Sequence, residues 1–226
     1  MAERITKKDL KKPDQLQTTT EKLLQYAREN MQKIIVGSAV CVAVIALLSG
    51  WYIYSHFNER KAQELFGYAI SMTASSPAAG QAVAMMEIEK LREVVSKYPN
   101  TDAANLSRYT LGAVYLKVND IDNSIKFYEE FIAKSGGSEL KALAYNGLGY
   151  GHEAKGDFAG AFKYFEEAAK SPEGAAFRGA AYLNAGRAAE QLKDRQKALD
   201  SYKKALESKN DSMTEMFLKR KISELE

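Results

Sequence analysis

The sequence predicts an all-α protein in which an N-terminal transmembrane helix precedes an α-solenoid of helix hairpins, closed by a C-terminal capping helix. Two observations carry this prediction. A pattern of small and aromatic residues recurs three times at a spacing of 37 residues, and such a period is typical of stacked repeats whose neighbours complete one another's apolar core. Residues 34–54 form a run of 21 residues without a charge, in a chain that is 27% charged.

Residues 1–33 are predicted to form a cytoplasmic basic tail and a juxtamembrane helix. They contain eight Lys or Arg against five Asp or Glu. The segment Thr18-Thr19-Thr20-Glu21 has the form of a capping box, which predicts a helix start. Two roles stay open for the basic cluster: a topology signal attracted to anionic lipid, or a docking arm for a cytoplasmic partner. The cluster consists of Arg4, Lys7, Lys8, Lys11 and Lys12.

Residues 34–54 are predicted to span a membrane, because 21 residues in a helix measure about 31 Å against a hydrocarbon core of roughly 30 Å. Lys33 ends the run on one side, and an aromatic belt of Trp51, Tyr52 and Tyr54 ends it on the other. A cleaved signal peptide fits poorly, since its apolar part would exceed about 15 residues and no small-x-small site follows. The positive-inside rule then places the N-terminus in the cytoplasm and residues 55–226 across the membrane.

Residues 55–226 are predicted to be the repeat domain, with an irregular first hairpin over 57–98, repeats over about 105–138, 142–175 and 179–211, and a capping helix over 213–225. Each copy has a glycine in the middle of its first helix, where glycine costs up to about 1 kcal/mol relative to alanine. We therefore expect the glycine to be needed for packing. It would let the backbone of a neighbouring helix approach closely, and an aromatic side chain would fill the remaining space between the two helices. A capping box, Ser212-Met213-Thr214-Glu215, predicts where the last helix starts. The three copies are Leu111, Gly112, Tyr115, Asp120, Ser124, Tyr128, Phe131; Leu148, Gly149, His152, Asp157, Ala161, Phe165, Ala168; and Ala185, Gly186, Ala189, Asp194, Ala198, Tyr202, Ala205.

The order of these residues resembles the tetratricopeptide repeat, and the middle copy resembles it most. Such repeats usually run 34 residues, so the surplus is expected in the connections 135–138 and 171–174. Three positions depart from the pattern: Ser124 and Phe131 replace alanine, and Ala189 replaces an aromatic residue. The middle copy contains Tyr145, Leu148, Gly149, Gly156, Asp157, Ala161, Phe165, Ala168 and Pro172.

The sequence holds no pattern that indicates catalysis. The two histidines, His56 and His152, are 96 residues apart, and no Cys/His cluster or phosphate-binding loop is present. Of the 32 basic and 29 acidic residues, 24 of each lie in residues 34–226, and this balance disfavours nucleic-acid binding. We therefore expect a protein that is not an enzyme, with no cofactor, no metal, no nucleic acid and no small-molecule substrate.

In tetratricopeptide arrays the first helix of each hairpin lines a concave groove. Leucine and tyrosine dominate the matching positions here, so the expected ligand is an apolar segment, an amphipathic helix or an extended strand. The basic clamp by which chaperone-docking relatives hold a C-terminal carboxylate is absent, because its places hold Tyr109, Ala113, Gly147, Ala180 and Asn184. Ordinary packing between repeats is the alternative role. The predicted groove consists of Leu106, Tyr109, Leu116, Lys117, Leu143, Asn146, Tyr150, Glu153, Leu183, Arg187 and Glu190.

The whole layout resembles the YfgM-like family of bacterial inner-membrane proteins, ancillary subunits of the SecYEG translocon: a short basic tail, one span, and a tetratricopeptide-like domain beyond it. The resemblance implies a single-pass inner-membrane protein with a periplasmic domain. It implies, as partners, translocon subunits, periplasmic chaperones or exported chains, besides membrane lipid. Two functions follow as hypotheses. The first is a membrane-anchored, chaperone-like binding module in protein export; the second is an assembly scaffold for a pilus, secretion or cell-division complex with one fixed partner.

Overall fold

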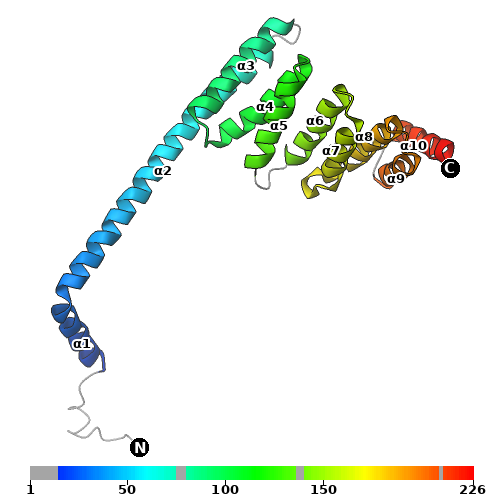
Figure 1. The fold of residues 1–226 in the computed structure, drawn as a ribbon. Helices are drawn as coiled ribbons and strands as arrows, with labels where there is room; N and C mark the ends of the chain where they lie inside the picture. The colour runs from blue at the N-terminus through cyan, green and yellow to red at the C-terminus, as the bar shows by residue number, and fades with distance from the viewer. Residues whose placement is uncertain (1–14, 75–79, 136–139, 209–210) are drawn as a thin grey trace, which may run out of the picture. The chain divides into compact units, whose positions relative to one another are not determined.

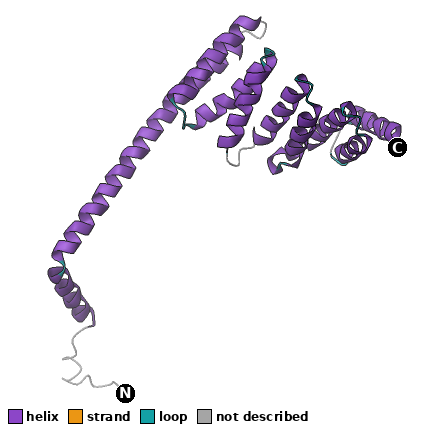
Figure 2. Cartoon of the chain, viewed as in Figure 1, coloured by secondary structure: helices purple, strands orange, loops and turns teal. Residues whose placement is uncertain are grey.

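The structure is a computed structural model of the 226-residue chain, and it describes residues 15–74, 80–135, 140–208 and 211–226. Within these ranges all regular structure is helical (Figure 2). The fold is the predicted all-α class. The chain divides into two compact units, residues 1–55 and residues 56–226. The basic cluster between Arg4 and Lys12 lies outside the described residues.

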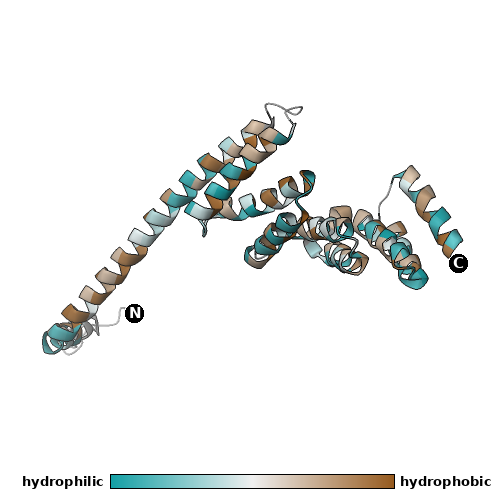
Figure 3. Cartoon of the chain, turned by 45° about the horizontal axis from the view of Figure 1, so that its top comes forward, coloured by the Kyte–Doolittle hydropathy of each residue, from teal (hydrophilic) through white to brown (hydrophobic). Residues whose placement is uncertain are grey.

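The first unit contains α1 (Gln15–Glu29) and the beginning of α2 (Met31–Ala74). The predicted capping box is wrong as a helix start, because Thr18 lies inside α1. The N-terminal half of α2 is the hydrophobic part of this helix (Figure 3). Its most apolar window has a mean hydropathy of 2.4 and none of it is buried, so α2 is long and apolar enough to cross a membrane.

The second unit begins with the remainder of α2 paired with α3 (Gly80–Lys97), where Ala69, Ile88 and Leu91 share a core cluster. Three hairpins then follow in chain order (Figure 1), and each helix packs mainly against its neighbours in sequence. The helices are α4 (Asp102–Lys117), α5 (Ile121–Lys134), α6 (Leu140–Ala154), α7 (Phe158–Lys170), the 3-10 helix η2 (Pro172–Phe177), α8 (Arg178–Gln191), α9 (Arg195–Leu206) and α10 (Ser212–Leu225).

The recurring aspartate of the repeat is the N-cap of each second helix. Asp120, Asp157 and Asp194 each accept a hydrogen bond from the backbone N–H three residues later. A side-chain acceptor at this position satisfies one of the unpaired amides of the first turn. The residue before each cap has a positive φ, 64° at Asn119 and 75° at Gly156 for example, which turns the chain tightly between the two helices.

The recurring glycine packs against an aromatic ring of the second helix. The predicted contact with the backbone of a neighbouring helix is therefore wrong. A methyl group on Gly112 would lie 2.7 Å from Cδ1 of Tyr128 on the second helix of the same hairpin. Gly149 faces Phe165 and Gly186 faces Tyr202 in the same way, both closely enough for a methyl group to clash. Each ring therefore packs flat against a backbone that has no side chain, which joins the two helices of a hairpin.

Two of the departures from the repeat pattern are explained by contacts. Ser124 is fully buried, and its hydroxyl donates a 2.8 Å hydrogen bond to the carbonyl of Gly112. Phe131 fills space beside Tyr109, with ring centroids 5.5 Å apart. These polar and aromatic contacts replace the small-residue packing that alanine gives elsewhere in the array.

The last helix, α10, closes the core at the C-terminal end. Its Leu218 is fully buried, and Phe217 meets the Tyr202 ring edge to face at 6.4 Å. The predicted N-cap Ser212 is wrong, because Asp211 holds that place and accepts from the amides of Met213 and Thr214. An aspartate that accepts hydrogen bonds from two backbone amides is a stronger cap than a serine, and the N-cap therefore lies one residue before the predicted Ser212.

Candidate functional site

The predicted groove residues all lie on the first helices of the three hairpins. None of the eleven side chains is fully buried, and Lys117, Tyr150 and Arg187 are exposed. They divide into Leu106, Tyr109, Leu116 and Lys117 on α4, Leu143, Asn146, Tyr150 and Glu153 on α6, and Leu183, Arg187 and Glu190 on α8.

The structure brings together the polar members from α6 and α8. Asn184 donates a 2.8 Å hydrogen bond to the Tyr150 hydroxyl and lies 3.4 Å from Oδ1 of Asn146. Arg187 reaches Glu153 at 3.2 Å, and its second nitrogen lies 3.4 Å from Oδ1 of Asn184. These bonds hold the two helices in register and fix the direction of the exposed Tyr150 ring.

Asn184 is the residue at the centre of this network, and it is not one of the predicted groove residues. It is 8% exposed, which is unusual for an asparagine. Its signal in the sequence is a single asparagine in the middle of an alanine- and glycine-rich helix, a place where a buried polar group needs a partner.

A groove of about 720 Å³ opens beside this network. We call it the inner groove. Two predicted residues, Tyr150 and Leu183, line it, while the contribution of η2 and of the segment leading into α10 was missed. Its walls combine small apolar side chains with a few polar ones, as in binding sites for apolar ligands. The lining residues are Tyr150, Ala175, Ala176, Phe177, Gly179, Ala180, Leu183, Asn184, Ser208, Asp211 and Thr214.

Tyr109 and Glu190 are engaged in packing away from the inner groove. The Tyr109 ring lies 5.9 Å from that of Tyr128, and burial raises the pKa of Tyr109 above its usual value. Glu190 accepts a 2.8 Å hydrogen bond from the Tyr202 hydroxyl and pairs with Lys221 of α10 at 2.9 Å. Glu190 therefore attaches the last helix to α8.

His152 packs within the middle repeat. Its Nδ1 lies 2.8 Å from Oδ2 of the N-cap Asp157, and its ring centroid is 4.9 Å from that of Tyr164. The backbone N–H of Gly160, and next the His152 hydrogen bond, lower the pKa of Asp157 below its ordinary value. Across the described ranges no three His, Cys, Asp or Glu residues gather where they could hold a metal ion.

Repeated helical hairpins with an open groove define a protein of the repeat-solenoid class. The chain belongs to the tetratricopeptide repeat-like domain family, whose model matches residues 25–226. Domains of this family bind proteins. No curated protein matches the chain.

Solved structures share the fold at low sequence identity. The crystal structure of the MamA protein superimposes with a TM-score of 0.55 at 17% identity, covering 72% of this chain and 87% of that one. PilF of Pseudomonas aeruginosa gives a TM-score of 0.53 at 16% identity, and the match covers 73% of this chain and 69% of PilF. BtubC from P. vanneervenii gives a TM-score of 0.52 at 17% identity, and the match covers 76% of this chain and 82% of BtubC. At such identities the likeness concerns the fold alone.

Proposed function

We propose that this protein is a membrane-anchored protein-binding module that acts as an accessory or chaperone-like factor at the protein-export translocon, with residues 55–226 in the periplasm. The observation that carries the proposal is the inner groove, because it offers Tyr150, Leu183 and Phe177 to a ligand beside a few fixed polar groups. Such a surface suits apolar stretches of many sequences.

The apolar part of α2 supports the membrane anchor. Its large side chains are exposed, with Leu47 74% and Trp51 69% exposed, and contiguous apolar surface of this extent favours a lipid environment. An anchor also serves weak binding: it keeps the groove near the place where chains emerge, which raises the effective concentration of the groove.

The proposed ligands are exported chains emerging in an unfolded state, together with translocon subunits and periplasmic chaperones. An unfolded chain exposes short apolar segments, which the inner groove can hold by packing while the polar residues satisfy backbone groups. The ordered network of Asn184 and Tyr150 favours such binding, because its side chains need no rearrangement before contact.

Affinity purification of the full chain from membranes in mild detergent, followed by mass spectrometry, tests the proposal. A heterogeneous set of exported proteins with translocon subunits is the expected result, and a Tyr150→Ala, Leu183→Ala variant should lose it. Glu64→Ala, at an exposed site on α2, is the matched control. A single stoichiometric partner of an envelope complex would instead favour the scaffold function and contradict the chaperone-like role.

A further inference from the structure

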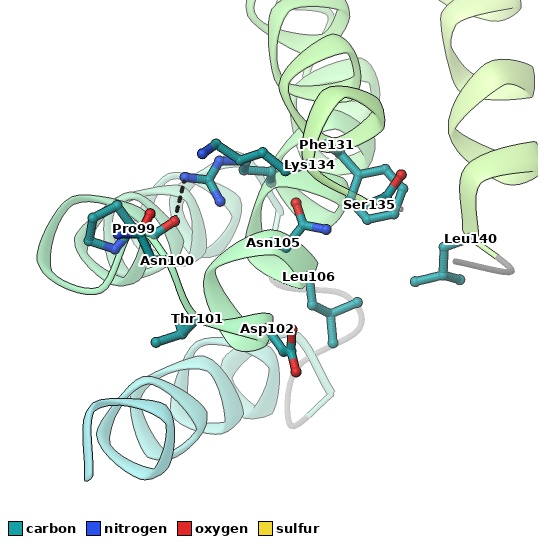
Figure 4. Close-up of a pocket in the computed structure, with 11 residues that line it drawn as sticks. Pro99, Asn100, Thr101, Asp102, Asn105, Leu106, Phe131, Lys134, Ser135 and Leu140 are labelled. Atoms are coloured by element: carbon teal, nitrogen blue, oxygen red, sulfur yellow. Dashed lines mark hydrogen bonds between the residues drawn. The ribbon is translucent and has the colours of Figure 1, made fainter. Parts of the chain in front are cut away.

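A second pocket lies at the ends of α4, α5 and α6, and it shares no lining residue with the inner groove. Its volume is about 550 Å³, and we call it the end pocket (Figure 4). One part of its wall is apolar, from Leu106, Phe131 and Leu140, and another part carries the cations Arg108 and Lys134. The complete lining is Pro99, Asn100, Thr101, Asp102, Asn105, Leu106, Arg108, Phe131, Lys134, Ser135 and Leu140.

Arg108 is a buried charge whose hydrogen-bonding capacity is mostly unused. It is 3% exposed, and one guanidinium nitrogen donates a 3.2 Å hydrogen bond to the carbonyl of Pro99. The nearest carboxylate, Glu130, is 3.6 Å from Nε, which is too long for a hydrogen bond. Nε and Nη1 of Arg108 and Oδ1 of Asn105 are buried without a hydrogen-bond partner among the described residues.

Leaving the guanidinium donors of Arg108 unpaired costs free energy. Buried polar atoms are normally paired, and a buried guanidinium with open donors costs more than a neutral group. Burial lowers the pKa of Arg108, and the neighbouring Glu130 carboxylate acts in the opposite direction. An additional anion is the group that would satisfy the open donors of Arg108, whereas Oδ1 of Asn105 is itself an acceptor and needs a donor.

Lys134 supplies a second cation at the same end of the pocket. It lies in the last turn of α5, is exposed, and forms no ion pair or hydrogen bond with described residues. Figure 4 shows the Asp102 side chain pointing away from Lys134, so it does not neutralise this end. Glu130 offsets part of the Arg108 charge, whereas Lys134 has no such carboxylate beside it among the described residues, so this part of the pocket attracts an anion.

We propose that the end pocket binds a carboxylate of a partner polypeptide, with Lys134 and Arg108 as its cationic partners. A neighbouring apolar side chain of the partner packs against Leu106, Phe131 and Leu140. The carboxylate belongs to an acidic side chain or to a chain end, since both present the same chemistry. None of the lining residues occupies a position of the basic clamp considered above. The inference rests on the proposed protein-binding function and adds a second, charge-selective contact to it.

Fluorescence anisotropy with the full chain in detergent micelles tests the proposal. Two pairs of fluorescein-labelled peptides serve as probes: Gly-Ser-Gly-Ser-Leu-Phe with a free or an amidated C-terminus, and amidated Gly-Ser-Xaa-Leu-Gly-Ser with Glu or Gln as Xaa. We expect the charged member of at least one pair to bind about tenfold more tightly than its neutral match, as for one charged hydrogen bond. The pair that shows the preference identifies the source of the carboxylate.

The variant Lys134→Glu should abolish this preference, because it reverses the accessible charge without touching the core. Lys126→Glu, at an exposed site on the same helix, should leave it unchanged. Arg108→Gln should also abolish it, with circular dichroism to check the fold; if that variant unfolds, the Lys134 result decides.

Equal binding within both peptide pairs, or a preference that survives Lys134→Glu, would overturn the inference. The proposed function fails on a different measurement, namely purification from membranes that recovers no exported chain. Recovery of exported chains without a carboxylate preference therefore refutes only the end pocket. A carboxylate preference without exported chains refutes only the proposed function.

Discussion

Replacing Gly149 with alanine places a methyl group against the ring of Phe165. That ring is fully buried and cannot retreat easily, since Tyr150 meets it edge to face at 5.2 Å on the same helix as the glycine. The methyl carbon would come too close to the ring atoms for a normal contact. One of the two helices of the hairpin must therefore move.

Two effects of opposite sign determine how much Gly149→Ala changes the free energy of unfolding. Alanine in a helix is more favourable than glycine by about 1 kcal/mol, while overpacking a filled core costs typically about 1–3 kcal/mol. The free energy of unfolding should therefore fall by about 1 kcal/mol for Gly149→Ala. Gly67→Ala is the control, because Gly67 is helical and a methyl group there meets nothing within 4 Å; it should raise the free energy of unfolding by up to about 1 kcal/mol.

Urea unfolding of the full chain in micelles, followed by circular dichroism, measures both variants. Combining Gly149→Ala with Phe165→Leu should reduce the cost of the added methyl group, because the smaller side chain leaves room for it. If Gly149→Ala stabilises the protein as much as Gly67→Ala does, the ring does not require the glycine and the packing argument is refuted.

Three further substitutions test side chains that cap a helix or hold it against its neighbour. Glu59 accepts from the first two amides of α4, so Glu59→Ala should cost about 1 kcal/mol in urea unfolding; an equal loss in Glu64→Ala would contradict a capping role. Glu190→Gln should speed hydrogen exchange in α10 about tenfold, from loss of a charged hydrogen bond, whereas Glu224→Gln, which is exposed, should not. Asp157 has a lowered pKa when folded, so its contribution to stability is present above the ordinary value of 3.8 and disappears as the pH falls through the folded value. The urea midpoint of Asp157→Asn should therefore depend less on pH below about 4 than that of the original chain; an unchanged dependence would refute the assignment.

The hairpins could be predicted because small residues, aspartates and aromatics recur at one period. What periodicity cannot give is the partner of each side chain. The glycine pattern indicated close packing, but whether a backbone or the ring of Phe165 fills the space depends on the crossing of two helices. Likewise, Ser212 and Asp211 both suit an N-cap, and only the backbone geometry shows that the aspartate holds the position.

The predicted groove residues do not all face the inner groove. Glu190 points to α10 because Lys221 lies there, a contact between residues 31 positions apart. Asn184 was missed because its role depends on Tyr150 of another helix. The predicted span over 34–54 and the start of the predicted first hairpin over 57–98 lie on one continuous helix, α2, which no proline interrupts between Tyr54 and Ala74.

Site-specific photocrosslinking in intact membranes tests most directly whether the inner groove is the binding surface. A photoreactive residue at position Tyr150 should capture exported chains or translocon subunits, and the same residue at Lys126, exposed on α5, should capture far fewer. Equal capture at the two positions, or capture of neither kind of protein at Tyr150, would contradict the account.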